Sequence, residues 1–172
     1  IIAAIVNFNT GIQLINITDP INPIYLDTLA AISPIETHSI KYNNGKTYIF
    51  IVQNATTDNI RIYDISNPDL GEVVPDGDLI FADPEVPYTL ALERRGANVY
   101  LFVSSESLTD GFVKVFDVST LTSINDIVPI DDLTLSAGTT NSILAKNGKL
   151  YVNTRVGVSA NYLYVYDTRD IE

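Results

Sequence analysis

The stretch NIRIYDISNP (residues 59–68) reads as one short strand followed by a turn, and the chain contains four versions of it. The other versions are GIQLINITDP (11–20), FVKVFDVSTL (112–121) and YLYVYDTRDI (162–171). Within the first stretch, Ile60 and Ile62 alternate with Arg61 and Tyr63, which is the period of a β-strand. The stretch therefore predicts a strand that ends at an Asp, with a turn beginning there.

The repeat has a period of about 50 residues. Asp64, Asp117 and Asp167 are 53 and 50 residues apart, and Asn16 stands 48 residues before Asp64. A Tyr in a dense apolar run precedes each Asp by 16 or 17 residues; these are Tyr48, Tyr100 and Tyr151. The spacing predicts a second strand in every copy, and IIAAIV (1–6) supplies it in the first copy.

Two further strands complete each repeat. HSIKYNNGK (38–46), TLALERRGA (89–97) and NSILAKNGK (141–149) each read as a strand that ends in a tight turn with Gly. Their Asn-Gly pairs, at 44–45 and 147–148, are strong hairpin signals because both central residues of that turn favour positive φ. A last strand follows each anchor, around 23–29, 71–80 and 126–135. No segment shows the three-and-four spacing of an amphipathic helix.

Four-stranded units that repeat every 40 to 50 residues are typical of a β-propeller, whose sheets pack face to face. We expect an all-β chain of 14 strands, with repeat units at about 1–34, 35–86, 87–139 and 140–172. The first unit would lack its first strand and the last unit its fourth. The chain is therefore expected to be one partial domain, an arc of about four blades from a larger ring of six to eight, with the other blades supplied by further sequence or another chain.

Composition excludes several classes of protein. The net charge is −11, with 21 acidic and 10 basic residues, so the average field repels phosphate backbones and nucleic acid is not an expected partner. No apolar run reaches the roughly 20 residues of a membrane span. The chain has no Cys, which excludes disulfides, thiolate metal sites and cysteine nucleophiles.

NIRIYDISNP and GIQLINITDP resemble the repeats of the LVIVD-repeat proteins, bacterial and archaeal β-propellers whose repeats carry a hydrophobic strand followed by Asp-Ile-Ser/Thr-Asx-Pro. The similarity covers essentially the whole chain, although the third copy (DVSTLTS) lacks the Pro and the fourth stops after DTRD. The resemblance implies a secreted or cell-surface protein that uses its propeller as a binding or scaffolding surface. It implies no catalytic residues.

The recurring anchors are expected to cap turns. A carboxylate or amide at a strand end accepts hydrogen bonds from the backbone N–H groups of the turn that follows. This role is predicted for Asn16, Asp64, Asp117 and Asp167, with metal binding as the alternative.

His38 is the only histidine, and the repeat aligns it with Thr89 and Asn141 at the start of each first strand. Inner strand ends converge at the mouth of a propeller channel, where ligands commonly bind. We therefore take His38, Thr89 and Asn141 as candidate channel-mouth residues. A histidine with a purely structural role is the competing interpretation, since a lone His beside Thr and Asn forms no nucleophile triad.

The acidic clusters of the chain are interpreted mainly as solvated surface charge. Carboxylates gather at Asp76-Gly77-Asp78, at Asp83 with Glu85, and at Asp126 with Asp131-Asp132, where calcium is the alternative ligand. No other cofactor is expected. Asn16 and Asn54 lie in N-glycosylation sequons.

Three functions remain open at this point. The leading hypothesis is an extracellular or cell-surface propeller segment that binds a protein or surface polymer without catalysis. The second is a propeller-type hydrolase or lyase with its site at the channel mouth near His38. The third is a structural subunit that self-associates through unfinished sheet edges.

Overall fold

The computed structural model describes residues 1–7, 11–31, 34–41, 44–53, 60–67, 75–79, 86–105, 111–121, 128–135, 139–156 and 160–171. Side chains are described throughout these ranges except at residues 39, 75–79, 105 and 156. The described part consists of strands and their connections and contains no helix, which confirms the all-β prediction. Within it, no helical segment has the length and apolar character of a membrane span.

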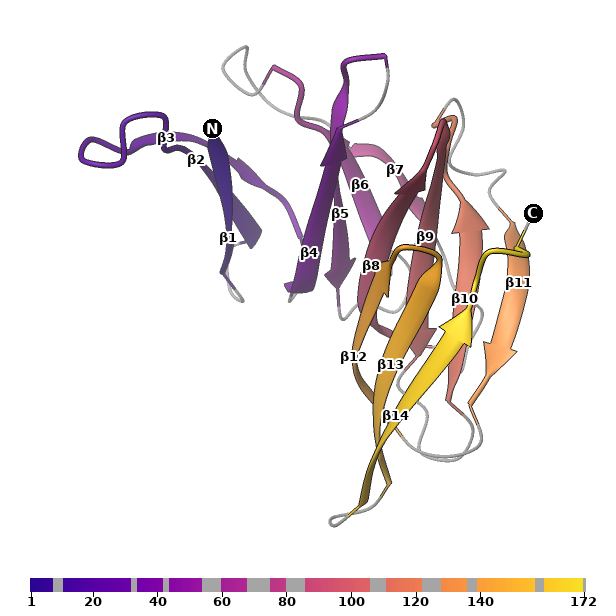
Figure 1. Ribbon diagram of the computed structural model, residues 1–172. Helices are drawn as coiled ribbons and strands as arrows, with labels where there is room; N and C mark the ends of the chain where they lie inside the picture. Colours follow the sequence, from indigo (N-terminus) through magenta and orange to yellow (C-terminus); the bar gives the residue numbers. More distant parts are fainter. Residues whose placement is uncertain are drawn as a thin grey trace. The chain divides into compact units, whose positions relative to one another are not determined.

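The strands form four antiparallel sheets (Figure 1). The first sheet contains β1 (Ile2–Asn7), β2 (Gly11–Asn16) and β3 (Ile24–Leu29). The second contains β4 (Pro34–Lys41), β5 (Thr47–Gln53), β6 (Ile60–Asp64) and β7 (Pro75–Leu79). The third contains β8 (Pro87–Arg95), β9 (Asn98–Ser105), β10 (Phe112–Asp117) and β11 (Pro129–Thr134). The fourth contains β12 (Thr139–Lys146), β13 (Lys149–Val156) and β14 (Ala160–Asp167).

Each sheet is a meander in which sequential strands are neighbours, and each corresponds to one sequence repeat. The chain divides into two compact units, an N-terminal unit (Ile1–Ile80) with the first two sheets and a C-terminal unit (Phe81–Glu172) with the last two.

Each unit has its own core between two sheets. In the N-terminal unit, Ile12, Leu14 and Leu29 pack with Ile49 and Ile51. In the C-terminal unit, one face of the third sheet packs against β12 and β13; the buried residues are Ala91, Tyr100, Phe102, Val113, Val115 and Leu135 with Ile143, Ala145, Leu150 and Val152. Both faces of β5 and β9 are buried because the apolar runs have no polar alternation, as expected for strands covered on two sides.

The repeats share their register in detail. In every sheet, the backbone N–H of the residue after the anchor donates to the carbonyl oxygen of the residue that precedes the anchor's partner on the neighbouring strand. These hydrogen bonds run from Ile17 to Ile1, from Ile65 to Thr47, from Val118 to Val99 and from Thr168 to Gly148. By this register, Tyr48 pairs with Asp64 and Tyr100 with Asp117, but Lys149 pairs with Asp167. The predicted equivalence of Tyr151 is therefore wrong by two residues, because β13 and β14 stay paired up to Val156 and Ala160.

Bulges also recur. Each fourth strand has one extra residue at the same register, namely Leu26 in β3, Asp76 in β7 and Ile130 in β11. Each first strand has one as well, namely Ile35 in β4, Tyr88 in β8 and Asn141 in β12. A bulge bends its strand and redirects the side chain of the extra residue.

Candidate functional site

The anchors lie in Asx turns. Each side chain accepts a hydrogen bond from the backbone N–H two residues later, with N···O distances of 2.9 Å at Asn16, 3.0 Å at Asp64, 2.9 Å at Asp117 and 3.2 Å at Asp167. In two copies the next Ser links the turn to the sheet, because Ser66 Oγ accepts from the Thr47 N–H and Ser119 Oγ from the Val99 N–H, both at 2.9 Å. The anchors thus hold strand ends together.

Two anchors also form ion pairs. Lys46 Nζ lies 2.8 Å from Asp64 Oδ2, and the Arg169 guanidinium donates to both oxygens of Asp167. Burial raises the pKa of Asp64, but the hydrogen bonds from Lys46 and Ser66 outweigh it, so the pKa lies below its usual range. The hydrogen bonds from Arg169 likewise hold the pKa of Asp167 below its usual range. These carboxylates are ionised at neutral pH and engaged in structure.

The three candidate channel-mouth residues lie at different registers, so their predicted equivalence is wrong. His38 pairs with Phe50, Thr89 pairs with Ser104, and Asn141 is the extra residue of its bulge. Thr89 is buried, whereas Asn141 is exposed. The alignment by sequence failed because the turns after the first strands differ. Five residues separate Lys41 from Thr47, whereas two separate Arg95 from Asn98 and Lys146 from Lys149, and Gly is the first turn residue in one of these two turns and the second in the other. That these residues ring a channel mouth stays a prediction.

Strand pairing makes a different set of residues equivalent in the three first strands. The residue that follows each bulge is Glu36 in β4, Thr89 in β8 and Ser142 in β12. Among these positions only Glu36 carries a titratable group. Its Oε1 lies 3.2 Å from His38 Nε2, and both side chains are about one-third exposed. Sequence analysis singled out His38 but missed Glu36, although the two-residue spacing places both on one face of a strand.

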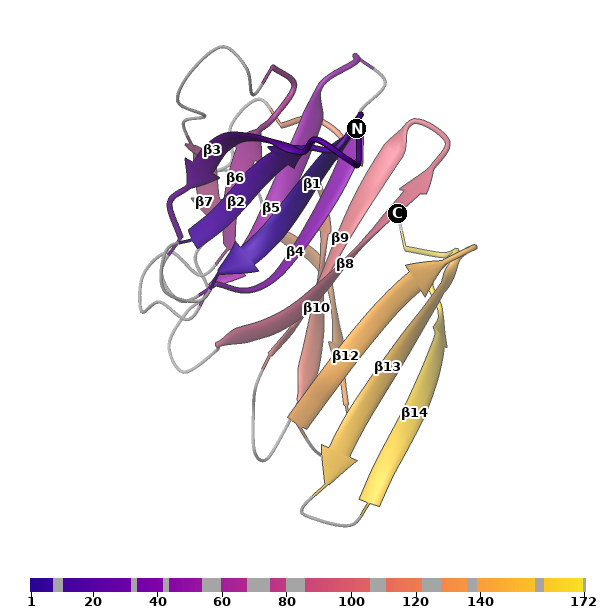
Figure 2. The same cartoon turned by 90° about the vertical axis from the view of Figure 1, so that its left-hand side faces the viewer.

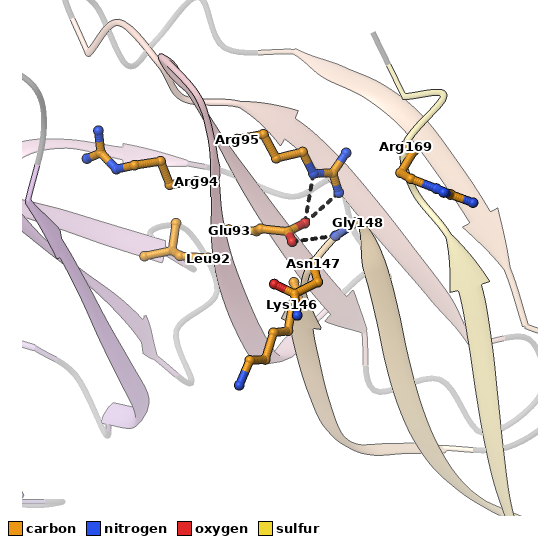
Figure 3. A pocket seen from close by; sticks show the side chains of 9 residues that line it. Leu92, Glu93, Arg94, Arg95, Lys146, Asn147, Gly148 and Arg169 are labelled. Atoms are coloured by element: carbon orange, nitrogen blue, oxygen red, sulfur yellow. Dashed lines mark hydrogen bonds and ion pairs between the residues drawn. The ribbon is translucent and has the colours of Figure 1, made fainter.

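A buried carboxylate, that of Glu93 in β8, lies at the opposite end of that strand from its bulge (Figure 3). It lines an open pocket of about 480 Å³ in the C-terminal unit; the lining residues are Leu92, Glu93, Arg94, Arg95, Ala145, Lys146, Asn147, Gly148 and Arg169. Glu93 is 7% exposed. Its Oε1 accepts from the Gly148 N–H at 2.7 Å, and its Oε2 accepts from Arg95 Nε at 2.8 Å and Nη2 at 2.6 Å.

Arg95 completes this contact, which we call the Glu93–Arg95 tie. Its guanidinium also donates to the backbone oxygen and the hydroxyl of Thr168, and it lies 4.9 Å from the ring centre of Tyr100. Both oxygens of Glu93 are therefore occupied, which suits a structural connection between β8 and the turn of β12–β13 better than proton transfer. Arg94 and Arg95 are the last two residues of β8.

No metal centre is apparent in the described residues, where no three His, Asp or Glu side chains come together. Asp131 and Asp132 lie on the exposed strand β11. The acidic residues Asp83, Glu85 and Asp126, and the sequon residue Asn54, lie outside the described residues, as do the side chains of Asp76 and Asp78. Calcium binding and glycosylation stay predictions.

Comparisons with known proteins concern the fold. No protein-family model matches the chain, and no curated protein sequence matches it, so the resemblance to LVIVD repeats stays a prediction. A solved structure of an α-L-arabinofuranosidase from Clostridium thermocellum, a five-bladed β-propeller of glycoside hydrolase family 43, is similar to the chain with a TM-score of 0.56 and 15% sequence identity. The likeness covers 91% of this chain and 57% of that one.

This likeness supports a propeller-like fold and corrects the functional expectation. We expected a scaffold without catalysis, and that expectation is overturned because the protein that shares the fold is a glycoside hydrolase. The finding favours the alternative of a propeller-type hydrolase. The expected cell-surface location and the protein or polymer partner are not tested by these comparisons.

Proposed function

We propose that the chain is part of a propeller-type glycoside hydrolase and that Glu36 is one of its two catalytic carboxyl groups. The carrying observation is the position of Glu36, which follows the bulge of the first strand of its sheet and keeps one-third of its side chain open to solvent. The fold of an arabinofuranosidase extends over nearly the whole chain and supports this choice. The blades are proposed to be part of a larger ring.

Glycoside hydrolysis needs one carboxylic acid that protonates the leaving oxygen and a second carboxylate that acts as base or nucleophile. Glu36 can fill one of these roles, because about one-third of its side chain is exposed and can reach a bound substrate. The tied carboxylate Glu93 does not suit either role, since both of its oxygens accept strong hydrogen bonds. The positions of β8 and β12 that match Glu36 carry Thr89 and Ser142, which have no carboxyl group. The second catalytic carboxylate is therefore proposed to come from another part of the protein.

Turnover of aryl glycosides tests the proposal. The purified protein, in the longest form in which it occurs, is assayed with 4-nitrophenyl α-L-arabinofuranoside, β-D-xyloside, β-D-galactoside and β-D-glucoside. We expect turnover of at least one of them and a loss of about a hundredfold or more in Glu36→Gln, which is the usual contribution of a positioned acid. Asp131→Asn, which removes an exposed carboxylate on β11, is the matched control and should keep full activity.

His38→Gln refines the role of the neighbour. If the contact with His38 Nε2 positions the carboxyl group of Glu36, kcat falls in this variant while the fold is kept. Absence of turnover on all four substrates, or turnover that Glu36→Gln leaves unchanged, would overturn the proposal.

A further inference from the structure

Exposed apolar side chains gather in two of the four repeats. Among the described residues, every large apolar side chain that is exposed belongs to the first repeat or to the fourth sheet, except Val128 and Ile130 at the start of β11. None belongs to the described side chains of the second sheet. Apolar surface that forms a patch in contact with water marks an interaction site. The first and fourth sheets are therefore the places where an apolar face stays uncovered.

The two sheets of each unit pack by the same positions. The core of the N-terminal unit combines Leu14 of the first sheet with Ile51 of the second. In the C-terminal unit the fourth sheet lies alongside the third (Figure 2), and their core combines Val115 with Val152. Leu14 and Val115 each stand two residues before their anchor, whereas Ile51 and Val152 each stand three residues after the residue that pairs with the anchor. We call the face with the first position the forward face of a sheet and the face with the second its backward face.

The forward face of the fourth sheet is apolar and open to water. Val165 stands two residues before its anchor, which is the position of the buried Val115. Leu163 lies on the same face by strand alternation, and pairing across the sheet adds Tyr151, opposite Val165, and Leu144, opposite Tyr151. Val165, Leu163 and Leu144 are 52%, 66% and 55% exposed, whereas Val115 is 0% exposed. This face therefore repeats the forward face of the third sheet without its cover.

The backward face of the first sheet is the other open apolar face. Ile5 holds the register position that Ile51 holds in the second sheet and Val152 in the fourth. It is 47% exposed, whereas Ile51 and Val152 are 0% exposed. Ile15 of β2 lies on the same face, and Tyr25, its partner on β3, is 56% exposed. The first sheet thus presents the kind of surface on which a forward face packs in both units.

The charges at the hairpin end of these two faces, where a first strand turns into a second, are opposite in sign to those of the covered pair. In the third sheet, Glu93 of the forward face meets the fourth sheet at Gly148, in a pocket that Arg169 also lines. Lys146 takes the position of Glu93 in the fourth sheet, because each is opposite the residue that pairs with the anchor. In the turn after the anchor, where the fourth sheet has Arg169, the first sheet has the exposed Asp19. A cation on the open forward face thus matches an anion on the open backward face.

We propose that the forward face of the fourth sheet binds the backward face of the first sheet in a second copy of this chain. Both units show a forward face covered by a backward face, and the described chain has one open face of each kind. A second copy supplies the partner for both, with apolar side chains at the centre and Lys146 beside Asp19 at the rim. The contact joins unlike surfaces, so it is head-to-tail and differs from pairing of sheet edges. It does not depend on the proposed glycosidase function.

The mass of the assembly tests this inference. The protein, in the longest form in which it occurs, is measured by size-exclusion chromatography with light scattering over a dilution series. Leu163→Glu charges the forward face of the fourth sheet, Ile5→Glu charges the backward face of the first, and Val165→Glu is a second variant of the forward face. Val128→Glu, at a side chain that is 69% exposed and belongs to neither sheet, is the matched control. Circular dichroism checks that each variant keeps the fold.

We expect the parent and Val128→Glu to associate in a concentration-dependent way. Each variant on either face should weaken association about thirtyfold or more, because it places a charge at the centre of an apolar contact. An equimolar mixture of Leu163→Glu and Ile5→Glu should form a dimer, since each copy keeps the face that the other lacks. A head-to-tail contact gives this recovery, whereas a contact between two identical faces does not.

Several results would overturn the inference. A parent that stays a single copy at every concentration would mean that the open faces bind no second copy. Association that only one of the two faces controls would show that both copies use the same face. Association that none of the variants weakens would place the contact elsewhere, for example at a sheet edge. A mixture of Leu163→Glu and Ile5→Glu that remains monomeric would contradict the head-to-tail arrangement.

Discussion

The two ends of the inter-sheet core in the C-terminal unit carry polar groups in opposite states. At the hairpin end, Glu93 is buried and Arg95 is partly exposed, and every oxygen of the carboxylate has a donor. At the bulged end, Thr140 and Thr154 are fully buried and their hydroxyls have no partner in the described structure. Buried polar side chains at the two ends therefore show opposite degrees of hydrogen bonding.

This difference separates satisfied from unsatisfied buried polarity. A buried charge whose hydrogen bonds are all made joins elements and fixes their register, and removing one partner leaves the other charge in a medium that solvates it poorly. A buried hydroxyl without a partner costs stability relative to an apolar group of the same shape.

The largest effect is expected from breaking the tie. Glu93→Ala leaves the Arg95 guanidinium, whose side chain is 20% exposed, without its carboxylate, and it frees the Gly148 N–H. We expect a loss of about 3–5 kcal/mol in the free energy of unfolding, measured by urea denaturation. Glu93→Gln keeps the shape and one acceptor oxygen but removes the charge, and it should lose clearly less. Equal losses in the two variants would contradict this expectation and show that the carboxylate charge carries the contact.

A smaller effect is expected from the turn that receives the tie. Asn147 and Gly148 have φ values of 56° and 71°, and a Cβ on Gly148 would lie 2.5 Å from Cγ of Arg169. Gly148→Ala should cost about 1–3 kcal/mol, since it adds backbone strain and a clash that Arg169 must relieve. Gly45→Ala, at φ 88° with no atom within 4 Å of the added Cβ, isolates the strain alone. A cost at Gly148 no greater than at Gly45 would mean that the tie tolerates movement of its turn.

The smallest effect concerns a partly exposed carboxylate, that of Asp64 in its Asx turn. The folded-state pKa of Asp64 is lowered, so its contribution to stability is present above the unfolded pKa of about 3.9 and is lost as pH falls through the lower folded value. Asp64→Asn should flatten this acid limb while keeping the turn, as Asn16 does in the first repeat. The change in unfolding free energy at pH 7 should be under about 1 kcal/mol, because surface ion pairs contribute little. Unfolding curves from pH 2 to 7 measure both effects, and an unchanged acid limb would contradict the assignment.

The sequence predicted the sheets well because their signals are local. Alternation in residues 60–65, the Asn-Gly pair at 147–148 and the Asp anchors each depend on residues a few positions apart, and the four sheets follow the repeat. The register within the first strands could not be obtained in this way. One extra residue at Ile35, Tyr88 and Asn141 changes which side chain meets which partner, and no residue type marks a bulge of this kind.

The site depended on that register and on pairing across sheets. His38 was visible as the only histidine, but its partner Glu36 became prominent only when the strand pairing placed it level with Thr89 and Ser142. The buried hydroxyls of Thr140 and Thr154 were out of reach altogether, because nothing marks them in a chain rich in Ser and Thr. Burial and the absence of a partner among the described residues, rather than residue type, distinguish these two.

The fourth strands β3, β7 and β11 share one extra residue at a common register, at Leu26, Asp76 and Ile130, so these strands should be exchangeable between repeats. A strand whose irregularity falls at a common position can replace its counterpart without turning its core-facing side chains toward water. Chimaeras in which residues 24–29 and 129–134 trade places should therefore still assemble. Duplication of such a repeat yields copies whose strands can replace one another.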